Sequence, residues 1–384
     1  LVNFKLKDLG PQLITVIAVV LIFGFFTYNA QINMENRGID FGYGFLSQES
    51  SFDVQFSLIE YDGSHSYFRA YLVGLLNTIL VSVIGIIIAT ILGVIVGIAR
   101  LSPNYLINKF AAYYVEFFRN IPLLLQIFFW YFAALRALPL PEDAEPIFGV
   151  IFLTIKGLFI PAFVWNNLDI FLYSLLAAII AIIVIRSYSK KLREHEGKHI
   201  PVLYISLGLV IGLPILSFLI GGVTLSFEMP ELVQLAKTSF RFNGGLGLPP
   251  ELIALTLALA LYTATFIAEC VRAGIQGVSK GQKEAAASIG LKPNQVLKLV
   301  IMPQALRIII PPTTNQYLNL TKNSSLAAAI AYPDLVLVFA GTALMQTGRA
   351  IEIVSITMLT YLTLSVSISI LMNWYNKKIA IKEK

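Results

Sequence analysis

Residues 279–303, SKGQKEAAASIGLKPNQVLKLVIMP, form a polar, alanine-rich island between two long apolar runs. Ser279 and Gln282 match the capping box that satisfies free N–H groups at a helix start, so we predict a helix over 280–289. Gly290 stands where a left-handed C-terminal cap belongs. A helix of about ten residues is only marginally stable alone in water. We therefore expect this segment to dock against a partner surface.

The composition of the chain indicates a membrane protein. The 384 residues are 57% hydrophobic and 13% charged, and the mean hydropathy is +0.76. A soluble protein has about 25% charged residues, so we predict an all-α polytopic membrane protein in contact with the lipid bilayer. The net charge of +6 is explained by membrane orientation, and no nucleic acid partner is expected.

The spans can be read from runs of apolar residues. About eight segments are long enough to cross a bilayer as helices. The apolar stretch 323–345 is predicted to re-enter the membrane or to cap its outer face. Three prolines, Pro303, Pro311 and Pro312, predict a break in the seventh span. The predicted spans cover residues 11–31, 70–99, 110–136, 168–186, 202–221, 251–273, 297–320 and 352–374.

Lysine and arginine are distributed unequally between the segments that connect these spans. With the N-terminus inside, most of the 28 basic residues lie on the cytoplasmic side, as the positive-inside rule requires. This orientation places both termini and residues 279–303 in the cytoplasm. In the second span, Gly93 and Gly97 form a G-x-x-x-G pair, which predicts close contact with a neighbouring helix.

Two pairs of opposite charges are predicted within or beside the spans. Glu116 and Arg119 are three residues apart in the third span, and Glu269 and Arg272 repeat this spacing at the cytoplasmic end of the sixth. Residues at this spacing share a helix face, so each pair can be an ion pair. A lone charge in mid-membrane costs roughly 3 kcal/mol. The pair in the third span therefore either holds helices together or lines a polar pathway.

Amide side chains inside the spans are candidates for the path of a polar substrate. Such groups are costly in lipid and commonly line a pathway or a water-filled cavity. The alternative for them is hydrogen bonding between helices. The predicted pathway residues are Asn77, Asn120, Asn315, Gln316 and Asn319.

One short motif points to a different chemistry. His195, Glu196 and His199 match the H-E-x-x-H pattern of zinc metalloproteases. However, Gly197 weakens the helix that this motif requires, and a catalytic zinc needs a third ligand that the following sequence does not supply. We therefore predict a solvated basic turn and no metal site. A membrane zinc protease and a channel or assembly subunit are the rival functions.

The opening stretch resembles the EAA loop of ABC-importer permeases. Glu284-Ala285-Ala286, Gly290 and Pro303 have the family spacing E-A-A-x3-G-x9-I-x-L-P, with Val300 and Met302 as apolar replacements for Ile and Leu. The resemblance implies that helix 280–289 is a coupling helix. In that family such a helix sits in a groove of a separate ATPase, so the coupling residues implied here are Glu284, Ala285, Ala286, Gly290 and Pro303.

Further motifs narrow the resemblance to the polar amino-acid (histidine/glutamine-type) permeases. Arg119-Asn120-Ile121-Pro122-Leu123-Leu124 is similar to the family stretch R-G-T-P-L-L, and its Asn-Ile variant points toward the general L-amino-acid subgroup. The size also resembles the larger permease subunit of general L-amino-acid or glutamate/glutamine/aspartate/asparagine systems. The implied fold is a type I ABC-importer transmembrane domain with an inserted helix pair.

The resemblance also implies a domain organisation. Residues 1–68 would hold an N-terminal transmembrane helix and a periplasmic loop. Residues 69–137 and 250–384 would form the permease core, with coupling helix 280–289. Residues 138–249 would be inserted periplasmic loops and two extra transmembrane helices.

The implied partners are a second related permease in a heterodimer, two copies of an ATP-binding subunit and a periplasmic amino-acid-binding protein. The chain contains no G-x-x-x-x-G-K-[ST] phosphate loop, so ATP and Mg²⁺ are expected on the partner ATPase and no cofactor on this chain. The implied function is translocation of polar L-amino acids across the bacterial inner membrane, without enzymatic activity of its own.

Overall fold

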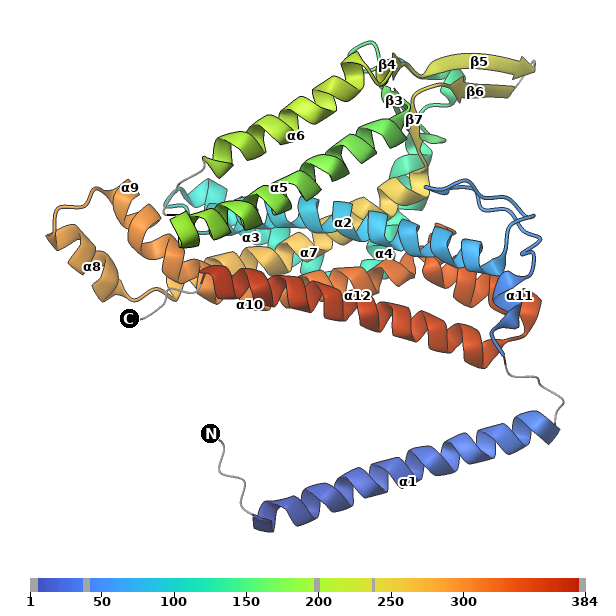
Figure 1. Cartoon of the computed structure of the whole chain (residues 1–384), viewed down its shortest axis with the longest axis horizontal. Helices are drawn as coiled ribbons and strands as arrows, with labels where there is room; N and C mark the ends of the chain where they lie inside the picture. Colours follow the sequence, from blue (N-terminus) through green and yellow to red (C-terminus); the bar gives the residue numbers. More distant parts are fainter. Residues whose placement is uncertain (1–5, 37–41, 197–200, 237–238, 380–384) are drawn as a thin grey trace. The chain divides into compact units, whose positions relative to one another are not determined.

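The computed structural model describes residues 6–36, 42–196, 201–236 and 239–379. The chain divides into two compact units (Figure 1). The larger unit comprises Leu1–Leu125 and Leu255–Lys384, and the smaller unit comprises Gln126–Ala254.

Helices make up the larger unit. Apart from α1, whose apolar side chains are exposed, they bury apolar side chains against one another. All of them satisfy backbone hydrogen bonds within the helix, as a membrane requires. The short helix α4 (Leu123–Phe128) and the first turn of α7 connect this unit to the smaller one. The helices of the larger unit are α1 (Leu6–Asn36), α2 (Tyr67–Ala99), α3 (Tyr105–Asn120), α7 (Pro250–Gln276), α8 (Lys280–Ser288), α9 (Pro293–Gln295), α10 (Met302–Asn323), α11 (Leu344–Thr347) and α12 (Ala350–Ile379).

Helices α2 and α7 approach closely along the predicted glycine pair. A Cβ atom added at Gly93 would lie 2.6 Å from Cβ of Ile267, and one at Gly97 would lie 2.7 Å from Cβ of Val271. No side chain larger than hydrogen fits at either position without moving α7. The predicted G-x-x-x-G contact is therefore confirmed.

The predicted third span, 110–136, is bent. Helix α3 ends at Asn120, and Ile121 has an extended backbone with φ −98° and ψ 126°. A residue that precedes proline is disfavoured in helical conformation, and Pro122 follows here. The two helices on either side of this bend, Tyr105–Asn120 and Leu123–Ala137, together meet the criteria for one broken span or a re-entrant loop.

The predicted break in the seventh span is wrong. One helical run extends over Pro293–Ile330. Within it, the π-helical segment Val296–Ile301 leads into α10. Pro303 lies in the first turn of α10, a position that proline tolerates. Pro311 and Pro312 lie inside α10. The hydroxyls of Thr313 and Thr314 donate to carbonyls of the preceding turn at 2.8 and 2.9 Å, which satisfies polar groups beside the missing donors.

The apolar stretch 323–345 does not cross the bundle as one helix. A 3₁₀ segment, Ser324–Ile330, ends at Ala331, which has a left-handed φ of 58°. The chain then returns as a short apolar helix over Val336–Thr347. Leu335 packs so tightly on α2 that a Cβ atom at Gly74 would lie 2.9 Å from its Cα. This segment is a buried cap rather than a span.

By length and composition, six described helices could cross a membrane, or seven if the bent pair is one span. The predicted first span adds a shorter apolar helix, Leu13–Asn29, within α1. The prediction of about eight spans is close to this result.

The smaller unit contains a pair of long helices and three small antiparallel sheets. Helices α5 (Leu168–Glu196) and α6 (Val202–Leu219) are candidate spans, and the sheet orders are β1-β2-β7, β3-β4 and β5-β6. The predicted helical membrane fold is confirmed, although these small sheets form in segments that were predicted only as periplasmic loops. The strands are β1 (Phe152–Thr154), β2 (Gly157–Ile160), β3 (Ala162–Asn166), β4 (Thr224–Glu228), β5 (Glu231–Ala236), β6 (Ser239–Asn243) and β7 (Leu246–Leu248).

Candidate functional site

The predicted coupling helix is α8, Lys280–Ser288, which begins and ends within one residue of its predicted bounds. Its N-terminus differs from the prediction, because the side chain of Ser279 makes no capping hydrogen bond. The N–H of Gln282 instead bonds to the Ser279 carbonyl at 3.2 Å. The Gln282 side chain points elsewhere, with its Oε1 accepting from Nε2 of Gln304 at 3.4 Å.

The C-terminus of α8 is capped as predicted. Gly290 has a φ of +81°, and its N–H donates to the carbonyl of Ala287 at 2.9 Å. The N–H of Leu291 donates to the carbonyl of Ala286 at 3.3 Å. These two bonds form a Schellman motif, which sets the angle at which the chain leaves the helix.

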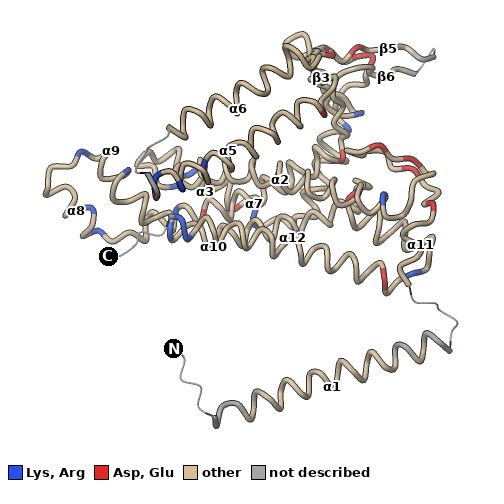
Figure 2. Tube along the Cα trace, in the orientation of Figure 1, with Lys and Arg blue, Asp and Glu red and all other residues tan. Residues whose placement is uncertain are grey.

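Most of α8 is exposed. Glu284 and Ala285 are exposed, and Ala286 is buried. The side chain of Ile289, directly after the helix, is 78% exposed. Figure 1 shows α8 and α9 extending beyond the ends of α7 and α10, and Figure 2 shows basic residues gathered at this end of the larger unit. The region is therefore a short, exposed helix in which most residues are small.

An ion-pair cluster joins α2 and α7 near this end. Nη2 of Arg272 lies 2.9 Å from Oε2 of Glu269, as the spacing predicted. Arg100, which caps the C-terminus of α2, pairs with the other carboxylate oxygen of Glu269. Arg100 was not predicted as a partner of Glu269, because the two residues are far apart in the sequence. The cluster locks the ends of two helices together.

The predicted pair Glu116–Arg119 does not form among the described residues. Both side chains are exposed on α3, and the Arg119 guanidinium carbon instead lies 4.8 Å from the centre of the Phe266 ring of α7. Arg119 occupies the last turn of α3, from which it reaches across to the neighbouring helix. A cation–π contact thus replaces the ion pair predicted from helical spacing.

Asn77, one of the predicted pathway residues, is held by hydrogen bonds to two other segments of the chain. Its side chain is fully buried, and Nδ2 donates to the carbonyls of Phe56 at 2.8 Å and Pro333 at 2.9 Å. The hydroxyl of Tyr332 donates to the carbonyl of Asn77 at 3.1 Å. Asn77 therefore ties the loop before α2 and the cap after Ile330 to one point.

Replacing Asn77 by alanine is expected to release this cap. Two buried carbonyls would lose their donor, which costs about 1–3 kcal/mol each when they stay unsatisfied. Limited proteolysis of the reconstituted permease should then cut segments 42–66 and 331–343 faster than in the parent. Asn29→Ala, in α1, removes an amide that bonds only its own helix and serves as the control. Equal cleavage of the Asn77 variant and the parent would contradict the assigned role.

The other predicted amides lie on or beside α10. Asn315 and Asn319 are exposed, four residues apart on the same helix face, and Gln316 is partly buried. Asn120 is exposed at the end of α3.

Two cavities follow the contact between α10 and α12. One of about 230 Å³ is lined by Asn315, Thr314, Ser369, Asn373 and Asn376 among others. The second, of about 490 Å³, is lined by Lys322, Ser325, Tyr361 and Ser365 among others. Lys322 lies three residues beyond Asn319, on the same face of α10. The structure therefore places polar side chains in two hollows along one helix pair.

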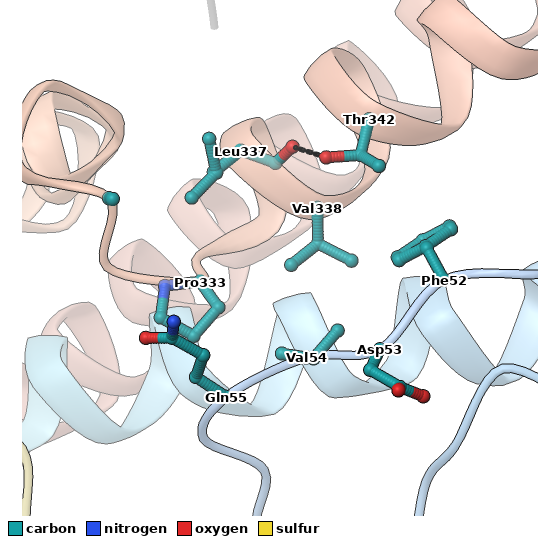
Figure 3. Close-up of a pocket in the computed structure, with 9 residues that line it drawn as sticks. Phe52, Asp53, Val54, Gln55, Pro333, Leu337, Val338 and Thr342 are labelled. Carbon is teal, nitrogen blue, oxygen red and sulfur yellow. Dashed lines mark hydrogen bonds between the residues drawn. The ribbon is translucent and has the colours of Figure 1, made fainter.

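At the opposite end of the larger unit, the loop 42–66 is held rigidly. A pocket of about 240 Å³ lies between residues 52–55 of this loop and residues 331–342, with Asp53 and Gln55 at its rim and Thr342 bonded to the Leu337 carbonyl (Figure 3). The Ser64 hydroxyl and N–H donate to the Asp62 carboxylate, and these bonds lower the pKa of Asp62. Loop 42–66 is thus an ordered surface.

Two buried carboxylates escaped the sequence predictions. Asp334 is fully buried, and its Oδ1 accepts from the N–H of Leu337 at 2.9 Å, which caps the short helix there. Oε1 of buried Glu352 accepts from the N–H of Gly42 at 2.9 Å and lies 3.5 Å from Nη1 of Arg349. Each is an acidic residue beside an apolar run, and this position in the sequence could have predicted a buried carboxylate. Both hold the cap in place.

The H-E-x-x-H motif falls largely outside the described residues. His195 and Glu196 form the last turn of α5, and His199 lies within the undescribed residues 197–200. In the described part of the chain, no group of three or more His, Cys, Asp or Glu could hold a metal ion.

Comparison with known proteins decides the family. Residues 200–381 match the family described as "Binding-protein-dependent transport system inner membrane component". YhdX of Escherichia coli (strain K12), named as an amino-acid ABC transporter permease protein, is 48% identical over 374 residues, which cover 97% of this chain and 94% of YhdX. The chain belongs to the amino-acid ABC transporter permeases.

Other relatives of this permease agree. The general L-amino acid transport system permease protein AapQ of Rhizobium johnstonii is 44% identical over 99% of this chain and 94% of its own length. The glutamate/glutamine/aspartate/asparagine transport system permease protein BztB of Rhodobacter capsulatus is 42% identical over 93% of this chain and 89% of its own length. A solved structure of an amino acid ABC transporter with histidines aligns at a TM-score of 0.47 and 20% identity, covering 81% of this chain and 95% of that one.

The permease is a membrane subunit of an ABC importer and not an enzyme, because ATP hydrolysis in this family belongs to a separate subunit. The zinc-protease alternative is thereby excluded.

Proposed function

We propose that this permease translocates polar L-amino acids across the bacterial inner membrane and is driven by a separate ATPase that docks on α8. The observation that carries the proposal is the exposed, rigidly capped helix Lys280–Ser288 at the basic end of the larger unit. Short connections join α8 to two long helices: residues 277–279 lead from α7, and residues 289–292 lead to the helical run that contains α10. A movement of α8 would therefore be transmitted to two candidate membrane helices.

The proposed assembly has a second related permease as heterodimer partner, two ATP-binding subunits carrying ATP and Mg²⁺, and a periplasmic amino-acid-binding protein. The names of AapQ and BztB, which refer to L-amino acids and to glutamate, glutamine, aspartate and asparagine, support the substrate class. Within this assembly, Glu284 would pair with a basic residue of the ATPase. The division into 1–68, the core 69–137 and 250–384, and the insertion 138–249 belongs to the same proposal.

The proposed orientation has both termini in the cytoplasm. Arg100, Arg272 and the end of α12, which carries Lys377 and Lys378, lie at the same end of the larger unit as α8. The acidic residues of loop 42–66 lie at the other end (Figure 2). This distribution obeys the positive-inside rule.

The proposed substrate path follows the α10–α12 contact. Asn315, Asn319 and Lys322 share one face of α10, and the two cavities there supply hydroxyl and amide groups. An amino acid carries both charges of a zwitterion, and the Lys322 ammonium is suited to its carboxylate. Asn120 and Gln316 remain candidates at the edges of this path, whereas Asn77 does not.

Reconstitution tests the function. The permease, purified with its partner permease and ATPase in proteoliposomes, should take up radiolabelled glutamine only with ATP and the loaded binding protein. Asn319→Ala should lower this uptake about tenfold, because a hydrogen bond to a charged group is worth about 1.5–3 kcal/mol. Asn29→Ala, in α1, is the matched amide control and should transport normally.

Two results would count against the proposal. An ATPase that neither binds the permease nor is stimulated by it would favour a channel or assembly subunit. Normal uptake by the Asn319 and Asn315 variants would show that the substrate does not follow the α10–α12 contact. It would not contradict the importer function.

A further inference from the structure

The β3–β4 ribbon of the smaller unit has one apolar face. The register pairs Phe163 with Phe227 and Trp165 with Leu225. Directly opposed residues, and residues two apart on one strand, share a face of a sheet. One face therefore carries Phe163, Phe227 and Leu225, which are 59%, 54% and 45% exposed. The Phe163 and Phe227 rings meet edge to face at 4.5 Å.

The other face of the same ribbon carries mostly polar side chains, with Ala162 and Val164 as its apolar members. Ala162 pairs with Glu228, Val164 with Ser226 and Asn166 with Thr224. The Asn166 amide donates to the Thr224 hydroxyl at 3.1 Å, and the Ser226 hydroxyl donates to the Val164 carbonyl at 3.3 Å. The ribbon is thus amphipathic across its thickness, although no described part of the smaller unit buries its apolar face.

The ribbon is attached directly to two candidate membrane spans. β3 ends one residue before α5 begins, and β4 starts shortly after α6 ends, so the ribbon extends the end of this helix pair (Figure 1). Both connections have left-handed backbone, at Asn167 with φ 56° and Gly222 with φ 63°. Nδ2 of Asn167 donates to the Gly222 carbonyl at 3.1 Å, which fixes the ribbon to the ends of both helices.

We infer that the apolar face of this ribbon lies on the lipid bilayer, in the headgroup zone next to α5 and α6. In the most apolar segment of α5 only 6% of the residues are buried, and in that of α6 only 11%. An apolar surface therefore continues from these helices onto the ribbon. The ribbon cannot enter the hydrocarbon, because a two-stranded sheet has two open edges with unpaired backbone groups. Aromatic side chains above hydrated backbone are typical of the membrane–water interface.

The consequence is an anchor for the helix pair. A ribbon that rests on the lipid surface resists tilting and vertical sliding of α5 and α6. In the orientation proposed above it lies on the outer leaflet; the contact with lipid itself does not depend on the transport function.

Site-specific fluorescence in a bilayer tests this inference. The full-length permease with Cys270→Ser is labelled at Phe163→Cys with an environment-sensitive thiol probe, in nanodiscs of phosphatidylethanolamine and phosphatidylglycerol. The matched control is Ser226→Cys, on the opposite face of the same ribbon. The probe at 163 should show blue-shifted emission, loss of emission with headgroup-spin-labelled lipid, and protection from aqueous iodide. The probe at 226 should show the reverse.

Three outcomes would overturn the inference. Equal iodide quenching at 163 and 226 would show that the apolar face is in contact with water and not with lipid. Protection of 163 from both iodide and spin-labelled lipid would assign the face to a protein partner, and equal lipid quenching at both positions would remove the orientation. Leu225→Cys, on the same face as Phe163, gives an independent reading if the first variant does not fold. None of these readings involves transport, so a negative result here leaves the proposed function untouched.

Discussion

Replacing Gly290 by valine is expected to uncouple ATP hydrolysis from amino-acid uptake. Gly290 has a φ of +81°, a conformation in which a side chain costs about 1–2 kcal/mol and a β-branched residue is a genuine outlier. The Schellman bonds of Gly290 and Leu291 would be strained or lost. Helix α8 would then leave its docking position relative to α7 and α10.

The measurement is ATP-driven uptake in proteoliposomes, followed together with ATP hydrolysis. We expect uptake near background, whereas the ATPase keeps basal turnover but loses its stimulation by loaded binding protein. Delivery of substrate by the binding protein should be intact, because the outer face is unchanged.

Gly281→Ala is the matched control for this variant. A Cβ atom meets nothing within 4 Å at either Gly281 or Gly290, and only Gly290 requires a positive φ. Gly281 lies inside α8, so alanine there should preserve coupling. If Gly290→Val transports as well as Gly281→Ala, then the cap of α8 does not transmit force, and the coupling role proposed for this loop fails.

The second large effect is expected from Gly97→Leu. The added side chain would meet Val271 and the backbone carbonyl of Ala268, which already lies 2.8 Å from an ideal Cβ. A backbone atom cannot move aside without shifting α7. Overpacking of this kind costs about 1–3 kcal/mol, occasionally more, and here it would also disturb the nearby pair between Arg100 and Glu269. We expect a lower midpoint of thermal unfolding in detergent and poor recovery of the assembled complex.

The control for Gly97→Leu is Gly208→Leu in α6. Gly208 is also a glycine within a candidate membrane helix, but nothing lies within 4 Å of its ideal Cβ. Leucine there should leave thermal unfolding nearly unchanged. Equal losses in the two variants would show that leucine in a membrane helix is itself harmful, and that the contact between α2 and α7 is not the cause.

Local sequence predicted local structure well. The bounds of α8, its Gly290 cap, the pairing of Glu269 with Arg272 and the close contact at Gly93 and Gly97 all depend on spacings of four residues or fewer, or on a single backbone conformation. Such features follow from helix geometry alone. The family motif from Glu284 to Pro303 likewise lies within one continuous segment of the sequence.

Several features could not be predicted in this way. The break expected at Pro311 and Pro312 does not occur, and α10 continues through both prolines. Arg119 contacts the ring of Phe266, which is over one hundred positions away in the sequence, and does not pair with Glu116, which is three positions away. Strands β1 and β2, and strands β5 and β6, form local hairpins that the sequence analysis did not predict. The β2–β7 and β3–β4 pairings join residues more than fifty positions apart, so local sequence could not predict them.

The sequence by itself predicted that this protein spans a membrane, where most of its long helices lie, and that a short helix capped by Gly290 follows α7. Those properties follow from transfer of apolar side chains out of water and from hydrogen bonding within one helix, both of which act locally. Tertiary structure decided the roles of individual polar side chains. Asn77 faces Phe56 and Pro333, Arg100 faces Glu269, and Asn315 faces a cavity. A buried polar group is stabilised only by the partner it meets, and packing alone decides which partner that is.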